Sequence, residues 1–231
     1  MQQHAAYRRA LETAGLHVEV LPADDRFYDC VFVEDTAIVW GMEVLMTAMG
    51  SPGREGEQAA VRDYFALTHE LFELPAGATL EGGDVLHTGD VTYVGLSSRT
   101  NHAGAAALAQ FMKRAGRAVI QVEVANVLHL KTAATYLGDG VVIAAPGCVD
   151  LDRFRDLEVM RTADGEAGAA NCLRIGVSLL IPARYPASED ALKRFASARA
   201  LSVEVVDISE FEQGGGSLSC LSLLWRHELV K

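Results

Sequence analysis

The side chains best suited to bond-breaking chemistry are one cysteine and one histidine in apolar surroundings. Cys220 follows three consecutive glycines in the segment GGGSLSCL, a flexible turn that can deliver a thiol to a pocket, where a thiolate is a strong nucleophile. His129 lies in the apolar run VLHL, which is typical of a strand, and such surroundings can tune a general acid or base. Both residues also have a structural interpretation, because an apolar histidine is often a satisfied core residue and Cys220 can be a small core side chain.

Carboxylates gather beside two apolar runs. Asp29, Glu34 and Asp35 flank the run CVFV, and the segment EGGD at residues 81–84 directly precedes an expected strand. Collected in one pocket, these carboxylates would bind a cation, and a guanidinium offers them five N–H donors in one plane. The two glycines of EGGD let backbone and ligand approach closely. The same acids can instead cap turns at strand ends.

Two arginines lie in turn or cap segments, Arg54 after Pro-Gly and Arg99 before Thr-Asn. In such places a guanidinium can hold a substrate carboxylate through two parallel hydrogen bonds, or it can be an exposed, solubilising side chain. The four cysteines show no C-x-x-C spacing, so neither a zinc site nor a disulfide framework is predicted. No G-x-G-x-x-G follows an expected strand and no P-loop is present, so no cofactor is expected.

The elements that must position these residues are those of an α/β protein. Apolar periodicity predicts strands at residues 17–21, 37–40, 44–47, 84–87, 92–94, 118–124, 133–137, 141–145, 172–181 and 201–206. It predicts helices at residues 7–11, 55–74, 101–115, 151–157 and 188–198. The order of two strands, a helix and a strand recurs, which favours repeated units over one nucleotide-binding sheet.

Length, composition and charge narrow the partners. The 231 residues are 50% hydrophobic and contain no Pro-, Ser- or Gly-rich linker, so one domain over residues 1–231 is expected. A net charge of −11 repels phosphate backbones and anionic lipid surfaces, which makes nucleic acid and membranes unfavourable partners and a small cation a favourable one. Without a long apolar run or a signal-like start, the chain is expected in the cytoplasm.

Six motifs in order along the chain carry a family resemblance. Residues 29–35, 81–86, 93–101, 127–132, 170–172 and 214–221 together strongly resemble the dimethylarginine dimethylaminohydrolases, and the resemblance extends over about residues 3–225. It implies the pentein fold, an α/β propeller of five ββαβ units around a pseudo-fivefold axis. It also implies hydrolysis of Nω,Nω-dimethyl-L-arginine, or the monomethyl form, to L-citrulline and dimethylamine or methylamine, without a cofactor or metal, by a monomer or homodimer.

When the sequence is matched to the family position by position, the resemblance implies a role for each candidate residue. Cys220 would be the nucleophile, His129 the general acid and base, and Glu81 the acid that orients both the guanidinium and the histidine. The nearby carboxylates are expected to keep Cys220 a thiol until a bound cation favours the thiolate. The residues that would bind a small cationic amino acid are Asp29 and Asp35 at the guanidinium, Arg54 and Arg99 at the carboxylate, and Glu34 and the Gly214 carbonyl at the α-amino group.

Two departures from the family pattern keep alternatives open. The chain starts almost at the first helix, so the first unit is expected to lack its N-terminal strand and a lid loop, and residues 48–50 read AMG in place of the usual RPG. A catalytically impaired pentein is therefore one alternative. Another is an arginine deiminase, although those chains are longer and have an extra helical insertion. A third is a binding protein with this fold, like a translation initiation factor, which would not be expected to keep Cys220, His129 and Glu81 together.

Overall fold

The computed structural model describes residues 2–226, whose contacts divide the chain into two compact units. The first unit comprises Met1–Val20, Ala125–Val127 and Lys131–Ser219, and the second comprises Leu21–Val124, Leu128–Leu130 and Cys220–Lys231. Most of the candidate site residues, including Glu81, His129 and Cys220, belong to the second unit. The expectation of a single domain stays a prediction.

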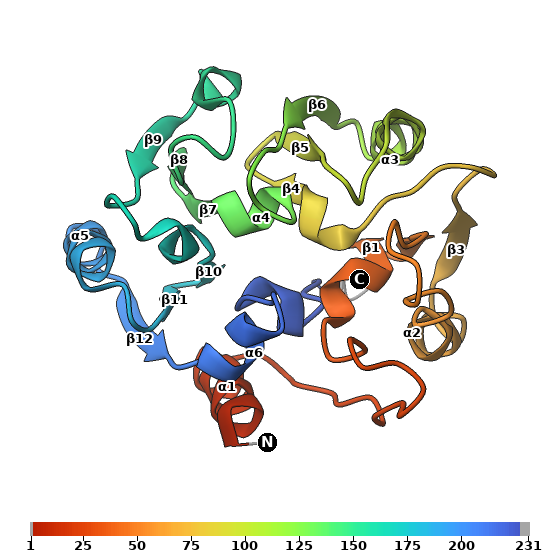
Figure 1. Cartoon of the computed structure of the whole chain (residues 1–231), viewed down its shortest axis with the longest axis horizontal. Coiled ribbons are helices and arrows are strands. Elements are labelled where there is room, and N and C mark those ends of the chain that lie inside the picture. Colours follow the sequence, from red (N-terminus) through yellow and green to blue (C-terminus); the bar gives the residue numbers. More distant parts are fainter. Residues whose placement is uncertain (1, 227–231) are drawn as a thin grey trace, which may run out of the picture. The chain divides into compact units, whose positions relative to one another are not determined.

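The second unit contains two three-stranded sheets of the same topology (Figure 1). In each sheet an antiparallel hairpin is followed by a helix and then by a third strand that pairs in parallel with the second strand of the hairpin. The first sheet consists of β1 (Ala37–Trp40), β2 (Glu43–Met46) and β3 (Glu70–Glu73), and its crossover contains α2 (Ala59–Phe65). The second sheet consists of β4 (Val85–His87), β5 (Val91–Leu96) and β6 (Ala118–Glu123), and its crossover contains α3 (His102–Arg114). The parallel third strand requires the crossover that each helix supplies.

The first unit repeats this topology twice. Its sheets are β7 (Ala134–Gly138), β8 (Val141–Ala144) and β9 (Glu158–Arg161), and β10 (Leu173–Ile175), β11 (Ser178–Pro182) and β12 (Ser202–Val206). The crossovers contain the 3₁₀ turn η3 (Leu151–Phe154) and helix α5 (Pro186–Ser197), and helices α1 (Gln2–Thr13) and α6 (Ser209–Gln213) complete the unit. Within residues 2–226 the order of a hairpin, a crossover and a parallel third strand thus occurs four times, with an α-helix in three of the crossovers and a 3₁₀ turn in the fourth.

The apolar face of α3 forms part of the core of the second unit. Leu108 and Met112 are fully buried on this face and pack in one cluster with Leu45 and Val94 from the two sheets of the unit and with Leu80, which directly precedes the EGGD motif. The helix begins where the Asn101 side chain accepts a hydrogen bond from the Gly104 N–H at 2.9 Å. The loop that carries Arg99 is therefore anchored directly to a buried helix.

Several sequence expectations hold and several are wrong. The repeated ββαβ order is confirmed, but residues 17–21 form no strand because nothing pairs with them. The long helix expected over residues 55–74 ends at Phe65, and residues 70–73 pair with β2 as the strand β3. The single strand expected over 172–181 is a hairpin that turns at Gly176, whose φ of 54° favours glycine. The helix expected over 151–157 is one 3₁₀ turn, and the strand β9 was missed.

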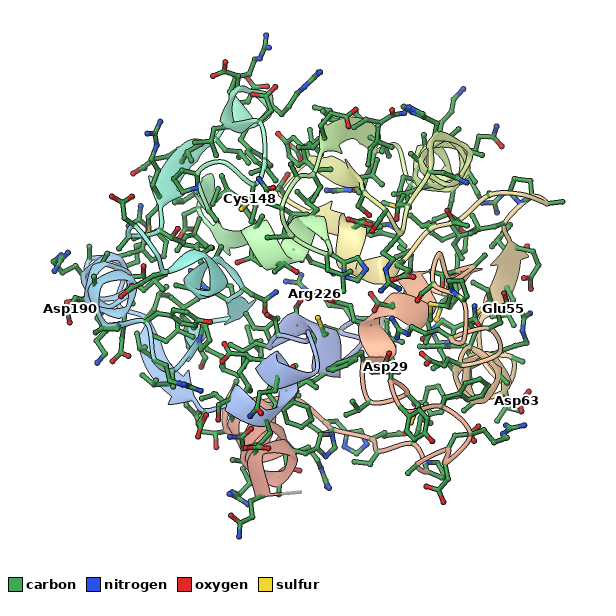
Figure 2. The ribbon with its side chains drawn as sticks, in the orientation of Figure 1. Asp29, Glu55, Asp63, Cys148, Asp190 and Arg226 are labelled. Atoms are coloured by element: carbon green, nitrogen blue, oxygen red, sulfur yellow. The ribbon has the colours of Figure 1, made fainter. Side chains whose placement is uncertain are left out.

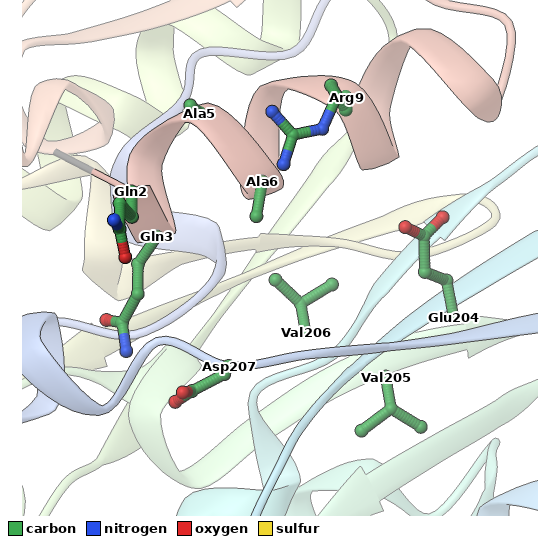
Figure 3. Close-up of a pocket in the computed structure, with 9 residues that line it drawn as sticks. All are labelled: Gln2, Gln3, Ala5, Ala6, Arg9, Glu204, Val205, Val206 and Asp207. Carbon is green, nitrogen blue, oxygen red and sulfur yellow. The ribbon is translucent and has the colours of Figure 1, made fainter.

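A groove of about 490 Å³ lies between α1 and β12 in the first unit (Figure 3). Polar side chains line it, among them Gln2, Gln3 and Arg9 from the helix and Glu204 from the strand. It contains no cysteine and no histidine, so it lacks the nucleophile and acid–base groups that the sequence singles out. Among residues 2–226, no helix has both the length and the apolar character that crossing a membrane demands.

Candidate active site

A buried carboxylate and imidazole form the centre of the candidate site. Glu81 Oε2 lies 2.7 Å from His129 Nε2, and the two side chains are 0% and 3% exposed. Asp35 Oδ1 lies 3.8 Å from the same nitrogen. Burial lowers the pKa of His129, but the hydrogen bond to Glu81 and the negative charges of Asp35 and Asp84 outweigh burial and raise this pKa above 6.5. The site therefore favours an imidazolium, which can donate a proton.

His129 precedes a short helix and does not lie in the strand that its apolar neighbours suggest. It occupies a bend directly before α4 (Leu130–Ala133). The apolar neighbour Leu130 is fully buried, so it anchors the segment as a strand residue would, but through packing at a helix start. The prediction of a strand around His129 is thus wrong, while its predicted burial is confirmed.

The glycines of the EGGD motif let three segments of the chain meet. The 3₁₀ turn η2 (Gly82–Asp84) packs against the 3₁₀ turn η1 (Val33–Thr36) so closely that a Cβ on Gly82 would lie 1.9 Å from the Glu34 carbonyl oxygen. A Cβ on Gly83 would lie 2.7 Å from the His129 ring, and the Gly83 N–H donates to Asp35 Oδ1 at 2.9 Å. The close approach that these glycines allow is therefore to the protein's own backbone and imidazole.

Arg54 is buried among the carboxylates and is not an exposed cation. Its Nη1 lies 2.8 Å from Asp35 Oδ2 and 3.7 Å from Glu81 Oε2, and its Nη2 lies 2.8 Å from Glu57 Oε2. Burial lowers the pKa of Arg54, but its bonds to Glu57 and Asp35 outweigh burial and raise it above the usual range. Three buried acids thus surround one planar guanidinium with matching geometry.

Arg99 reaches the same acid from a different loop. Its Nη1 lies 3.4 Å from Glu81 Oε1, and its side chain is 20% exposed. The Gly50 N–H donates to this oxygen at 2.9 Å, and a Cβ on Gly50 would lie 2.4 Å from the Arg99 carbonyl oxygen. The glycine of the unusual AMG sequence is therefore what allows the Arg54 loop and the Arg99 loop to pack together.

Cys220 lies in the 3₁₀ turn η5 (Ser219–Leu221) and is 6% exposed. It belongs to the same compact unit as Glu81 and His129. The residue before it is held firmly, because the Ser219 N–H donates to Asn171 Oδ1 and the Asn171 amide donates to the Ser219 hydroxyl, both at 2.9 Å. None of the four cysteines forms a disulfide, and Cys172 is a buried core residue.

The remaining candidates differ in how they relate to this centre. Asp29 is half-buried on the loop that leads into η1 (Figure 2), and its charge contributes to a raised pKa at Glu57, for which burial is the main cause. Glu34 is buried in η1 beside Asp35. Gly214 belongs to the first unit, where it is exposed at the C-cap of α6.

Two further acids belong to the centre, although neither is among the residues to which the resemblance assigns a role. Glu57 lies three residues after Arg54, a spacing that signals an ion pair within one turn, and Asp84 closes the EGGD motif. Metal binding is another use of acids and histidine, and ligand atoms of Asp35, Glu81 and His129 lie within 4.8 Å of one another. These atoms already bond to each other and to Arg54, so the chain's own cations neutralise the set.

Comparison with known proteins places this geometry in a family. The family model described as arginine deiminase matches residues 25–175. The dimethylarginine dimethylaminohydrolase of Pseudomonas aeruginosa is 34% identical over 96% of this chain and 87% of its own length. The enzyme of the same name from Streptomyces coelicolor is 38% identical over 98% of this chain and 86% of its own length.

Solved structures agree with these relatives. A mutant of the Pseudomonas aeruginosa enzyme in complex with citrulline superposes with a TM-score of 0.87 at 31% identity, covering 95% of this chain and 86% of that one. The N-terminal domain of a cyanobacterial arginine dihydrolase bound to substrate has a TM-score of 0.86 at 18% identity, covering 96% of this chain and 84% of that domain, which supports the fold alone. The fold is thus the expected pentein fold, and the chain belongs to the dimethylarginine dimethylaminohydrolases, hydrolases of the arginine deiminase family.

Proposed function

We propose that this protein hydrolyses Nω,Nω-dimethyl-L-arginine, and the monomethyl form, to L-citrulline and dimethylamine or methylamine. The observation that carries the proposal is the buried cluster of Asp35, Glu57 and Glu81, which holds the Arg54 guanidinium beside the His129 ring. A cluster that binds one planar guanidinium in a buried setting has the charge and geometry to bind another.

The chemistry assigned to this site needs a nucleophile and a proton donor. A guanidinium carbon is a poor electrophile because three nitrogens share its positive charge, so we assign attack on this carbon to the Cys220 thiolate. His129, held protonated by Glu81, then donates its proton to the departing dimethylamine, and the C–N bond breaks to leave a covalent S-alkylthiouronium. The neutral His129 next removes one proton from water as the water oxygen attacks the same carbon; the C–S bond then breaks to release citrulline, and the second water proton passes to the sulfur, which restores the Cys220 thiol.

The substrate groups are assigned as follows. Asp35 and Asp29 take the guanidinium nitrogens, which requires Arg54 to give up Asp35 while it keeps Glu57. Arg54 and Arg99 take the substrate carboxylate, and Glu34 and the Gly214 carbonyl take the α-amino group. Arg99 is the better supported of the two arginines, because it is partly exposed and makes one long contact to Glu81.

One specific observation supports a second candidate, hydrolysis of unmethylated arginine. The matching family model is described as arginine deiminase, and the same nucleophile and acid–base pair would serve that reaction with ammonia as the leaving group. The two candidates differ only in the substituents on the leaving nitrogen, so turnover of methylated and unmethylated arginine distinguishes them.

The test is a citrulline assay on the purified chain with dimethylarginine, monomethylarginine and arginine as substrates. We expect citrulline from the methylated substrates, none from Cys220→Ser, and normal turnover by the control Cys148→Ser, which changes a half-buried cysteine of the first unit (Figure 2). Citrulline formation that survives Cys220→Ser would exclude the mechanism, and faster turnover of arginine would favour the second candidate.

A further measurement tests how the thiolate forms. Alkylation of Cys220 is followed against pH with and without an amidinium ligand. If a bound cation stabilises the thiolate, the alkylation midpoint moves to lower pH when the ligand is present. An unchanged midpoint would refute this part of the mechanism.

A further inference from the structure

Asp84 is a fully buried carboxylate to which the mechanism above gives no role. Its Oδ1 accepts the Leu130 N–H at 2.9 Å and its Oδ2 accepts the Ser97 hydroxyl at 2.6 Å. An ionised carboxylate accepts both hydrogen bonds, so the surroundings of Asp84 suit its charged form.

One oxygen of Asp84 controls the backbone next to the imidazole. Leu130 directly follows His129 and is the first residue of α4. Glu81 holds the His129 ring at Nε2, and Asp84, three residues later in the same motif, holds the backbone behind the ring. The EGGD motif therefore fixes His129 at two points, which leaves the ring little freedom to rotate away from Glu81.

The other oxygen controls the loop that carries Arg99. The Ser97 hydroxyl, which donates to Asp84, accepts the N–H groups of Arg99 at 3.0 Å and Thr100 at 3.3 Å. Gly95 makes room for this arrangement, because a Cβ there would lie 2.5 Å from Asp84 Oδ1. Asp84, Ser97, Arg99 and His129 all belong to the second unit.

We propose that Asp84 is a positioning residue that couples the two ends of the substrate site: through Leu130 it orients the acid–base group His129, and through Ser97 it orients the carboxylate-binding group Arg99. This inference rests on the proposed function for the roles of His129 and Arg99. The bonds that carry it are independent of that function.

The charge of Asp84 also acts on His129. Burial raises the pKa of Asp84, while His129 and the donors from Ser97 and Leu130 oppose the rise. In turn, Asp84 is one of three acids that face His129, together with Glu81 and Asp35, and all three favour the protonated ring. Replacing Asp84 by the isosteric asparagine keeps an acceptor for Leu130 and removes the charge.

The test compares Asp84→Asn and Ser97→Ala with Asp90→Asn, a matched control that removes an exposed acid from the turn between β4 and β5. We expect Asp84→Asn to lower the His129 titration midpoint, followed by NMR of the ring protons, by about one pH unit. It should also lower kcat by about tenfold and raise KM, because it weakens both arms of the coupling. Ser97→Ala should raise KM while leaving kcat and the His129 midpoint unchanged, and Asp90→Asn should change none of them.

A merely structural Asp84 gives a different result. The folded variant would then show a lower unfolding temperature with an unshifted His129 midpoint and an unchanged ratio of kcat to KM, which would overturn the proposal. Equal effects of Ser97→Ala on kcat and KM would also overturn it, because the two arms would not be separate. If the wild-type chain makes no citrulline, the proposed function fails, while the His129 titration still decides whether Asp84 controls the imidazole.

Discussion

Replacing Glu81 by glutamine should lower the pKa of His129 to below that of an exposed histidine. Glu81 Oε2 and His129 Nε2 are 2.7 Å apart and both side chains are buried, so almost no solvent screens the pair. A close opposite charge shifts a pKa by about 1–3 units, and we take about 2 units for this pair. Asp35, at 3.8 Å, keeps part of its effect, but burial opposes the charged ring and then dominates.

The loss of protonated His129 is large at any pH above the pKa values of His129 in the wild type and in Glu81→Gln. A fall of about 2 units is about 2.7 kcal/mol, so the protonated fraction of His129 falls about 100-fold in Glu81→Gln. Because the proposed reaction needs this proton for the leaving amine, kcat should fall by at least the same factor.

The assay is an NMR titration of the histidine ring protons. The chain has seven histidines, and the signal of His129 is assigned as the one that is missing in His129→Gln. Glu57→Gln is the matched control, because Glu57 is a buried acid of the same cluster whose hydrogen bond goes to Arg54. A His129 midpoint that moves by less than about 0.5 unit in Glu81→Gln, or that moves equally in Glu57→Gln, would refute the electrostatic role of Glu81.

Three other predictions concern stability. Arg54→Ala leaves buried carboxylates without their cation and should lower the free energy of unfolding in urea by about 3–5 kcal/mol. The control Arg62→Ala, which breaks an exposed ion pair with Glu73, should lower it by less than about 1 kcal/mol. Similar losses for both variants would show that the Arg54 cluster is not a stabilising element. Gly82→Ala places a Cβ 1.9 Å from a backbone carbonyl and should cost about 1–3 kcal/mol or more in the same experiment, and an unchanged unfolding midpoint would mean that η1 and η2 are less tightly packed than described. Because the pKa of His129 is raised in the folded state, its contribution to stability is complete below about pH 6.5 and is lost as the pH rises through the folded pKa. The stability difference between the wild type and His129→Gln should therefore shrink from pH 6 toward pH 8, and a difference that grows with pH would contradict the direction of the shift.

Local patterns predicted most of the strands because alternation and tight turns are short-range properties. The hairpin of β4 and β5 and the start of α3 at Asn101 follow from residues within a few positions of each other. The helix expected over residues 55–74 was wrong because apolar residues in ELFE fit either element. Only pairing with β2, which no local pattern contains, decides that this segment is a strand.

The sequence predicted which residues belong to the candidate site better than it predicted the contacts between them. Glu81, Asp35 and His129 were singled out from their types and neighbours, and the structure brings these three together. The burial of Arg54 against Asp35 depends on residues that lie 19 positions apart, and the bond from Leu130 to Asp84 spans 46 positions. Contacts at such separations depend on how distant segments of the chain pack together and are not encoded in any single motif.

The Arg54 guanidinium has a consequence for molecular recognition. Since Asp35 already holds a cation of this shape, an incoming guanidinium that binds as proposed replaces the Arg54 guanidinium at this carboxylate, while Arg54 keeps Glu57. The ion pairs before and after binding are then nearly the same, so ion pairing contributes little to the net affinity. Discrimination must come from the other end of the ligand, so a bare alkylguanidine, which lacks the amino-acid moiety, should be a poor competitor despite carrying the same headgroup.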